Sequence, residues 1–419
     1  MPRNRAVEEM VRALVLEGFD HEFGAPAVKG ARDPVWQAVS GTGTRLWLDT
    51  GDIGVAAGLW NGEFEALTTN NTLLNREVQK GIYDDLIGKA AREIRGASPG
   101  IDTRSLLLEI AFVLNAYHAL RLVETFDAKV SVELHTGLAH DVDATIAYGK
   151  RFYSICPERF IVKVPLTPAG YLGARKLGKL KIPVNFTLGF SARQNYVAAL
   201  LSRPSYVNIF MGRLNAFVAD NGLGSGDNVG EKVTVSTQRE LLDLRVESLS
   251  RTALIGASMR EGNQVSDLAG LDVFTMPPAV AAAYHKRPDP EVSSRVGEYQ
   301  NVSFAEGVSV DDFNGATLWD VPVQFKTCVA DLLKKDVDSM VPDDLQSHFE
   351  EAGFGGFLPR WSDTDFAGVA ADGKIPGYER WKDRLSSGRV GMDALMTLSG
   401  LLSFTADQKA LDDRVASLL

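Results

Sequence analysis

One lysine, Lys163, is the only ionisable residue in the apolar segment FIVKVP at residues 160–165. Short apolar segments of this kind form strands in the core of a sheet, where an unpaired ammonium group is costly. Burial disfavours the charged form of an amine, and an uncharged amine can attack a carbonyl carbon to form a Schiff base. The segment therefore indicates class I aldol chemistry. For this segment alone, the ordinary alternative is a lysine that reaches solvent or pairs with a carboxylate.

Other polar residues stand at or just after the ends of similar apolar segments. Each alone has an ordinary explanation, such as a helix cap, a turn or a solvated arginine. Together they provide carboxylates, amides and two guanidinium groups, which a protein would need to bind and cleave a phosphorylated polyhydroxy ketone. These residues are Asp49, Asn70, Glu133, Asn185, Thr187, Asn208, Arg213 and Arg260.

The elements that carry these residues alternate between helices and short strands. Helical spacing of apolar residues predicts helices over residues 7–17, 75–95 and 105–122. Eight short apolar segments are predicted to be strands: RLWLD (45–49), FEALTT (64–69), KVSVEL (129–134), FIVKVP (160–165), KIPVNFT (181–187), YVNIFM (206–211), TALIGA (252–257) and LDVFTM (271–276).

Short apolar strands separated by helices are typical of a parallel sheet that is covered on both faces. Eight such repeats predict an α/β fold, a closed (β/α)8 barrel over residues 41–285, with a helical extension at residues 1–40 and a mostly helical one at 286–419. A doubly wound open sheet would need a glycine-rich phosphate turn after an early strand, and none follows RLWLD or FEALTT. In a barrel, the polar residues above would share the rim at the carboxyl ends of the strands.

Composition limits the classes of partner. The net charge of −10 argues against a nucleic-acid-binding surface, so a bound anion must be held by a local arginine cluster. The first residues lack the apolar core of a signal peptide and no uncharged run is long enough to span a membrane, which predicts a cytoplasmic protein without membrane contact. Two cysteines give neither a disulfide framework nor metal-ligand spacing, and His135 and His140 have no further ligands to complete a site. We expect neither a metal nor a cofactor.

Several linked motifs give the chain a family resemblance. The string LDTGDIGVAAGLWNGEFEALTTNNTLL (48–74) resembles the first two strands of transaldolases, and VSVEL, KVPLTPAG, VNFTLGFS, NIFMGRL and GASMREG follow in the family's order. The segment FTADQKALDDRVASLL (404–419) resembles the family's last helix, and Thr405 and Gln408 have the spacing of a capping box. The resemblance covers roughly residues 40–280 and 390–419.

The resemblance implies a role for each polar residue. It makes Lys163 the Schiff-base lysine, Asp49 the base for the C4 hydroxyl proton, and Glu133 with Thr187 the pair that activates water. The amides orient the hydroxyls of the three-carbon unit, and the two arginines clamp the terminal phosphate of the sugar. The implied substrate-binding residues are Asn70, Asn185, Asn208, Phe210, Arg213 and Arg260.

The implied reaction belongs to the pentose phosphate pathway. It moves a dihydroxyacetone unit from a ketose phosphate, sedoheptulose 7-phosphate or fructose 6-phosphate, to an aldose phosphate, glyceraldehyde 3-phosphate or erythrose 4-phosphate. Related fructose-6-phosphate aldolases have a tyrosine where this chain has Phe210. Since phenylalanine has no proton to donate, transfer is favoured over release of free dihydroxyacetone. The sugar phosphates are the expected partners, and the chain is expected to be a monomer or a homodimer.

The sequence also departs from the family pattern. Asn71 replaces an expected proline, Asn208 an expected serine, and His135 a common aspartate, which leaves open an aldolase or transaldolase that acts on a longer-chain or sulfonated ketose. A non-catalytic relative that only binds a sugar phosphate is the other alternative. Residues 221–236 are predicted to be an inserted loop, and residues 286–390 exceed the usual tail of the family.

Overall fold

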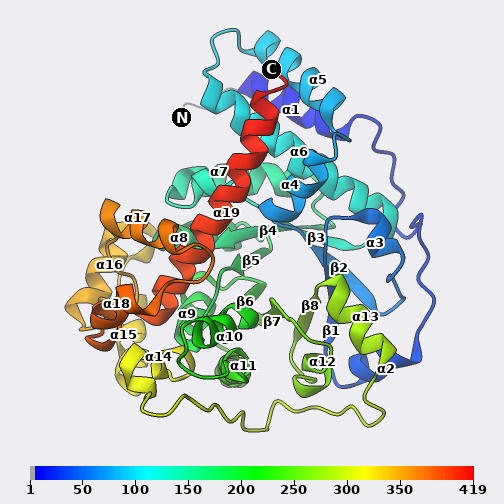
Figure 1. Ribbon diagram of the computed structural model, residues 1–419. Helices are drawn as coiled ribbons and strands as arrows, with labels where there is room; N and C mark the ends of the chain where they lie inside the picture. Colours follow the sequence, from blue (N-terminus) through cyan, green and yellow to red (C-terminus); the bar gives the residue numbers. More distant parts are fainter. Residues whose placement is uncertain (1–4) are drawn as a thin grey trace.

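Eight parallel strands pair in sequence order and close into a barrel, with β1 beside β8 (Figure 1). The computed structural model describes residues 5–419. The strands are β1 (Arg45–Asp49), β2 (Phe64–Thr68), β3 (Lys129–Glu133), β4 (Phe160–Pro165), β5 (Val184–Thr187), β6 (Tyr206–Phe210), β7 (Ala253–Ala257) and β8 (Val273–Met276).

Helices follow each strand and surround the barrel. From the N-terminus to the last strand they are α1 (Arg5–Leu16), α2 (Pro34–Gly41), α3 (Ile53–Ala57), α4 (Asn71–Gln79), α5 (Asp84–Ala97), α6 (Thr103–Phe126), η1 (Thr136–Leu138), α7 (Val142–Ile155), α8 (Pro168–Lys179), α9 (Ala192–Val197), η2 (Ala198–Ser202), α10 (Met211–Asp220), α11 (Val229–Val246) and α12 (Gln264–Asp267).

Further helices follow β8. They are α13 (Pro278–Lys286), η3 (Val310–Phe313), α14 (Ala316–Trp319), α15 (Val323–Leu333), η4 (Val337–Ser339), α16 (Pro342–Glu351), α17 (Asp363–Asp372), α18 (Tyr378–Ser386) and α19 (Met392–Ala416). The predicted (β/α)8 barrel with additional N- and C-terminal helices is therefore confirmed. The three predicted domain boundaries remain a prediction.

Alternation along the strands determines what lies inside the barrel. In β1, Leu46 and Leu48 belong to the large core between the sheet and the helices, whereas Trp47 belongs to a separate core within the barrel. Because successive side chains of a strand point to opposite faces, Asp49 points inward like Trp47, and Lys163 points inward like Ile161. The inward positions thus change from apolar at the amino end of these strands to polar at the carboxyl end.

The long helix α19 crosses the carboxyl end of the barrel and runs up to α4 and α5 (Figure 1). Its first turn is fixed by Asp393, which is fully buried and accepts hydrogen bonds from Ser191 (2.6 Å) and Arg193 (2.7 Å) just after β5. Thr397 donates to the carbonyl of Leu188 at 2.9 Å. The end of the chain therefore forms part of the roof above the strand ends.

Three sequence-based predictions of local structure were wrong. The predicted helix 75–95 is divided into α4 and α5, because Gly81 adopts a positive φ of 76° that favours glycine. The predicted inserted loop 221–236 is only partly a loop, since α11 begins at Val229. Thr405 does not cap a helix; it lies inside α19, and its hydroxyl donates to the carbonyl of Leu401.

One helix in the described part of the chain, α6, is long and apolar enough to span a membrane by length and composition. In its most apolar window 83% of the residues are buried inside the fold, as in the core helix of a soluble protein.

Candidate active site

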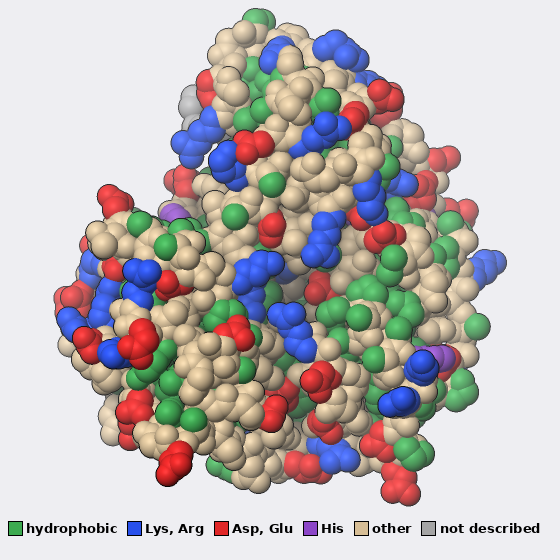
Figure 2. Space-filling model, in the orientation of Figure 1, with side chains coloured by type: hydrophobic (Ala, Val, Ile, Leu, Met, Phe, Trp, Pro, Cys, Tyr) green, Lys and Arg blue, Asp and Glu red, His purple; other side chains and the backbone are tan. Residues whose placement is uncertain are grey.

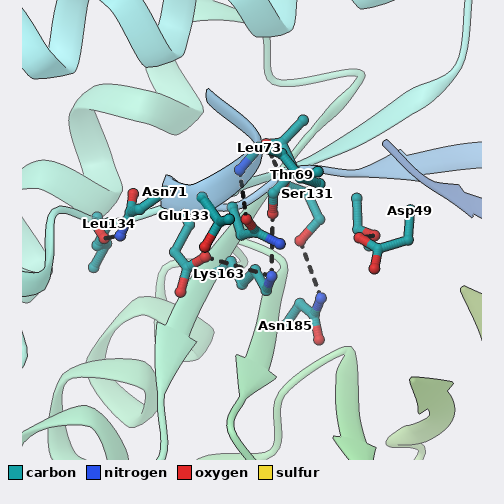
Figure 3. A network of polar contacts seen from close by, with 12 residues as sticks. Asp49, Thr69, Asn71, Leu73, Ser131, Glu133, Leu134, Lys163 and Asn185 are labelled. Carbon is teal, nitrogen blue, oxygen red and sulfur yellow. Dashed lines mark hydrogen bonds and ion pairs between the residues drawn. The ribbon is translucent and has the colours of Figure 1, made fainter. Parts of the chain in front are cut away.

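Lys163 lies inside the barrel, near the carboxyl end of β4, and its side chain is only 4% exposed. Its Nζ donates a hydrogen bond to the backbone carbonyl of Thr69 at 3.1 Å and lies 3.5 Å from Glu133 Oε2 (Figure 3). A carbonyl acceptor and one carboxylate therefore hold the amine in a space that is almost closed to solvent.

Strand register brings three polar side chains to one level of the barrel. Glu133 pairs with Lys163 across β3 and β4, and Lys163 pairs with Asn185 across β4 and β5. Residues that are paired in neighbouring strands point to the same face of the sheet. The amine of Lys163 is therefore flanked by a carboxyl group and an amide, and the Asn185 amide donates to Ser131 Oγ at 3.0 Å (Figure 3).

Three buried oxygens close to the lysine have no hydrogen-bond partner within residues 5–419. They belong to Asn185 (Oδ1), Thr187 (Oγ1) and Glu133 (Oε2), the last of which is in the 3.5 Å ion pair with Lys163. Buried polar atoms in native proteins are nearly always hydrogen-bonded, so a group of unpartnered ones indicates a place where a polar ligand or water completes the network. Thr187 follows Asn185 by two residues and points inward from the same strand.

Burial changes the acidity of both carboxyl groups. Desolvation raises the pKa of Glu133, while the nearby charge of Lys163 opposes the shift. Desolvation also raises the pKa of Asp49, opposed by Lys163 and by the Thr68 hydroxyl, which donates to Asp49 Oδ1 at 2.7 Å. Both groups can thus hold a proton closer to neutral pH than an exposed carboxyl group can, which suits acid and base chemistry.

Two arginines lie on the side of β6 and β7. Arg213, in the first turn of α10, is 8% exposed, and its Nη1 has no hydrogen-bond partner in the described chain. Its guanidinium carbon lies 6.0 Å from the ring centre of Phe210 and 5.6 Å from that of Phe404. Burial, with the charge of the neighbouring Arg260, lowers the pKa of Arg213 to about 10, so the group stays charged at neutral pH. Arg260 is exposed, at the mouth of the same cavity.

A cavity of about 560 Å³ connects these groups. It opens as a hollow bordered by lysine and arginine side chains near the middle of the face in Figure 2. Of the ten site residues predicted from the sequence, Glu133 and Thr187 do not line this cavity: Glu133 lies at the level of Lys163, and Thr187 lies two residues beyond Asn185 towards the carboxyl end of β5. The other eight do line it: Asp49, Asn70, Lys163, Asn185, Asn208, Phe210, Arg213 and Arg260.

Two of the predicted amides also have structural roles. Asn70 caps α4, because its Oδ1 accepts a hydrogen bond from the backbone nitrogen of Leu73 at 2.8 Å. The Asn208 Oδ1 accepts a longer one, 3.3 Å, from the backbone nitrogen of Gly189. In both residues the amide oxygen is engaged by the fold, which leaves the NH2 group as the part that can donate to a ligand.

The sequence analysis missed several residues of the cavity wall. Thr68 and Thr275 share a hydrogen bond of 2.7 Å and support Asp49 from the neighbouring strands. Both point inward at strand ends, so the same alternation that selected Asp49 could have found them. Further examples are Thr72, Arg76, Lys80, Ser258, Lys374 and Phe404. No local signal marked Lys374 or Phe404, which reach the cavity from the C-terminal segment.

A larger cavity of about 1130 Å³ lies between α1, α6 and α7. Its most buried charges, Glu109 and Arg151, already form an ion pair with each other. It contains no buried amine and no cluster of unpartnered polar atoms among the described residues. The chemistry therefore favours the smaller cavity at the strand ends.

The closed barrel, with a buried lysine between carboxyl groups at the carboxyl ends of its strands, defines a (β/α)8-barrel protein with a lysine-centred site. Residues 46–343 match the family described as Transaldolase/Fructose-6-phosphate aldolase. The chain belongs to this family, as the motifs in its sequence predicted.

Individual relatives are distant. A transaldolase of Xanthomonas campestris pv. campestris (strain B100) is 31% identical over 217 residues, which cover 50% of this chain and 66% of the relative. A transaldolase of Protochlamydia amoebophila is 26% identical over 250 residues, 58% of this chain and 75% of the relative. A probable transaldolase of Thermus thermophilus is 31% identical over 205 residues, 46% and 83% of the two chains.

Proposed function

We propose that this protein is a transaldolase of the cytoplasm and the pentose phosphate pathway. It transfers a dihydroxyacetone unit from sedoheptulose 7-phosphate or fructose 6-phosphate to glyceraldehyde 3-phosphate or erythrose 4-phosphate through a Schiff base on Lys163. The observation that carries the proposal is the buried amine, 3.5 Å from the Glu133 carboxyl group, in a cavity that Arg213 and Arg260 also line.

The first step joins the sugar to the enzyme. The Lys163 amine attacks the C2 carbonyl carbon to give a carbinolamine, whose hydroxyl group leaves as water when an acid supplies a proton. Glu133 is the nearest carboxyl group, and burial raises its pKa, so it can supply this proton. The unpartnered hydroxyl of Thr187 helps Glu133 to hold the water molecule.

The second step cleaves the sugar. Asp49 removes the proton of the C4 hydroxyl, the C3–C4 bond breaks, and its electron pair neutralises the iminium to form an enamine. The aldose phosphate leaves. Asn70, Asn185 and Asn208 hold the hydroxyls of the three-carbon enamine until a second aldehyde accepts it, and hydrolysis of the new imine releases the product.

Phe210 favours transfer over hydrolytic release. Its ring lies against the cavity, beside Arg213 and Phe404, and has no acidic proton. The enamine is therefore not protonated from this side, and it survives until an acceptor arrives.

Reduction with borohydride in the presence of fructose 6-phosphate tests the proposal. We expect one stable adduct per chain in the intact mass, located on Lys163 by peptide mapping, because borohydride reduces an imine to a secondary amine. Folded protein that remains unmodified at Lys163 would contradict the assignment. Turnover of fructose 6-phosphate without an acceptor would indicate an aldolase instead.

The arginines give a second prediction. We expect Arg213→Ala to raise KM for fructose 6-phosphate by about 100-fold, since a buried, charge-assisted contact to phosphate contributes about 2–3 kcal/mol. The KM for dihydroxyacetone, which has no phosphate, should change little. Arg251→Ala is the control, because Arg251 is exposed and precedes β7 at the opposite end of the barrel. Equal effects on both substrates would remove Arg213 from the phosphate site.

A further inference from the structure

We propose that Lys374, from the loop between α17 and α18, is a third cation of the phosphate-binding end of the cavity and a specificity residue for phosphorylated sugars. This inference rests on the proposed function and deepens it. Lys374 lies outside residues 46–343, the region that matches the family, so the C-terminal segment of this chain supplies it.

Lys374 lines the same cavity as Arg213, Arg260 and Lys163. Its side chain is exposed, and within the described chain its ammonium group has neither a hydrogen bond nor an ion pair. Most of the other lysines of the C-terminal segment do have a carboxylate partner; Lys382, for example, donates to Glu379 at 2.7 Å. A free cation at the mouth of a cavity can contact an anionic ligand without first breaking an ion pair.

The backbone of Lys374 is fixed in place. Helix α17 ends at Asp372, and the next residue, Gly373, has a φ of 84°, a conformation that glycine adopts easily. The fully buried hydroxyl of Ser399 lies 3.1 Å from the carbonyl oxygen of Gly373 and 3.0 Å from that of Lys374, and donates to this pair of carbonyls. The loop is thus attached to the helix that covers the strand ends.

The same turn of α19 also contacts Arg213. The residue after Ser399 is Gly400, and a methyl group placed there would lie 3.5 Å from Arg213 Nη1 and 2.7 Å from the side chain of Leu188. One turn of α19 therefore holds the Lys374 loop through Ser399 and lies close to the buried guanidinium group at Gly400. This arrangement brings the lysine to the arginine end of the cavity rather than to a remote part of the rim.

The charge at this end matches a phosphate monoester. Arg213 and Arg260 have no carboxylate partner within residues 5–419, and Asp407, whose charge acts on Arg213, accepts a hydrogen bond from Thr72. A phosphate monoester carries about −1.5 to −2 charges at pH 7. Three cations outnumber Asp407 and Glu133, the two carboxyl groups whose charges act on Arg213, and this surplus of positive charge suits a phosphate monoester.

The test compares Lys374→Met with Lys374→Arg, and uses Lys382→Met as a matched control on α18. Two quantities are measured for each protein: the Kd for inorganic phosphate by calorimetry, and kcat and KM with fructose 6-phosphate. We expect Lys374→Met to raise both the Kd and the KM by about 3- to 10-fold, with kcat and the KM for dihydroxyacetone unchanged. Lys374→Arg and Lys382→Met should resemble the wild type, and the effect should shrink as salt increases.

Unchanged Kd and KM in Lys374→Met would overturn the proposal, as would a wild type that does not bind inorganic phosphate. A loss confined to kcat or to the melting temperature would also overturn it, because that is the sign of a structural role. The phosphate titration does not depend on the Schiff base. If borohydride leaves Lys163 unmodified, the proposed function fails, and the titration still decides whether Lys374 binds phosphate.

Discussion

Replacement of Lys163 by methionine is expected to lower the rate of transfer between sugar phosphates by about 10⁴-fold or more, since Lys163 is the buried amine of the cavity. The other two lysines that line the cavity are exposed, and one of them, Lys80, is paired with Asp52 and Glu77. Methionine nearly matches the length of the lysine side chain and fills the barrel interior without an amine. The Glu133 carboxyl group then loses the amine 3.5 Å away, which opposes the rise of its pKa in the wild type, so the group can take up a proton more easily and the fold should persist. Adduct formation with borohydride should disappear together with activity.

The matched control is Lys129→Met, because Lys129 begins β3 at the amino end of the barrel and is exposed. It should keep full activity and full adduct formation. Inorganic phosphate should bind to Lys163→Met as it does to the wild type, since the arginines are unaltered. Transfer activity above about 1% of the wild type in folded Lys163→Met would mean that the barrel acts without a Schiff base on this residue.

The strands could be predicted because their environment is uniform. A strand in a closed barrel is covered on one face by the packed interior and on the other by helices, so the segments appear as short apolar runs. Where an inward position is polar, the run is interrupted, as Lys163 in FIVKVP and Asn185 and Thr187 in VNFT illustrate. These exceptions were the predicted site residues, and the structure directs them to one end of the barrel.

The wrong predictions of helix boundaries arose because the local spacing of apolar residues does not reveal backbone turns or contacts with distant residues. Ile82 has helical spacing with Val78, yet it is 51% exposed, because the positive φ of Gly81 ends one helix and a second begins at Asp84. The true start of α19 depends on buried Asp393, whose partners Ser191 and Arg193 lie about 200 residues away in the sequence. Nothing in the sequence near Thr405 indicates this distant attachment.

The same reasoning explains which site residues were missed. Thr68 supports Asp49 from the adjacent strand, so its contribution depends on register, which the sequence alone does not fix. Lys374 and Phe404 reach the cavity through the packing of α17 and α19 over the strand ends. Sequence reasoning identified the residues that are placed in the site by the strand on which they lie. It could not identify residues that tertiary packing brings into the site.

Asp49→Asn is expected to lower kcat for transfer by about 10²- to 10³-fold, the usual contribution of a positioned general base. Asparagine keeps the shape of the side chain and can still accept the hydrogen bond from Thr68, 2.7 Å long in the wild type, but it cannot take the C4 hydroxyl proton. KM for fructose 6-phosphate should change little. Imine formation on Lys163 does not require this base, so the variant should still form an adduct with borohydride.

The pH dependence provides a signature of the same residue. Burial raises the pKa of Asp49 above its ordinary value of 3.8. The active carboxylate form is therefore lost as the pH falls through the raised pKa. As the pH is lowered, kcat/KM of the wild type should begin to fall at a higher pH than it would with an exposed aspartate.

The stability of the fold should depend on pH in the opposite sense to the activity. A raised folded-state pKa stabilises the fold at low pH, and this contribution is lost as the pH rises through the raised pKa. Asp49→Asn has no carboxyl group at this position, so it does not lose this stabilisation as the pH rises. Its melting temperature should therefore vary less with pH. Because burial also raises the pKa of Glu133, Glu133→Gln is the parallel variant that separates the two carboxyl groups.

The mass of the trapped adduct tests the role of Asp49 directly. In the wild type, cleavage follows imine formation, so borohydride should trap mainly the three-carbon unit, once a proton from solvent has slowly converted the enamine to its imine form. In Asp49→Asn, cleavage is blocked after the imine has formed, and the adduct should carry the intact six-carbon sugar with its phosphate. Dihydroxyacetone, which needs no cleavage, should give both proteins the same adduct. A three-carbon adduct of equal yield from fructose 6-phosphate in both proteins would mean that a group other than Asp49 removes the C4 proton.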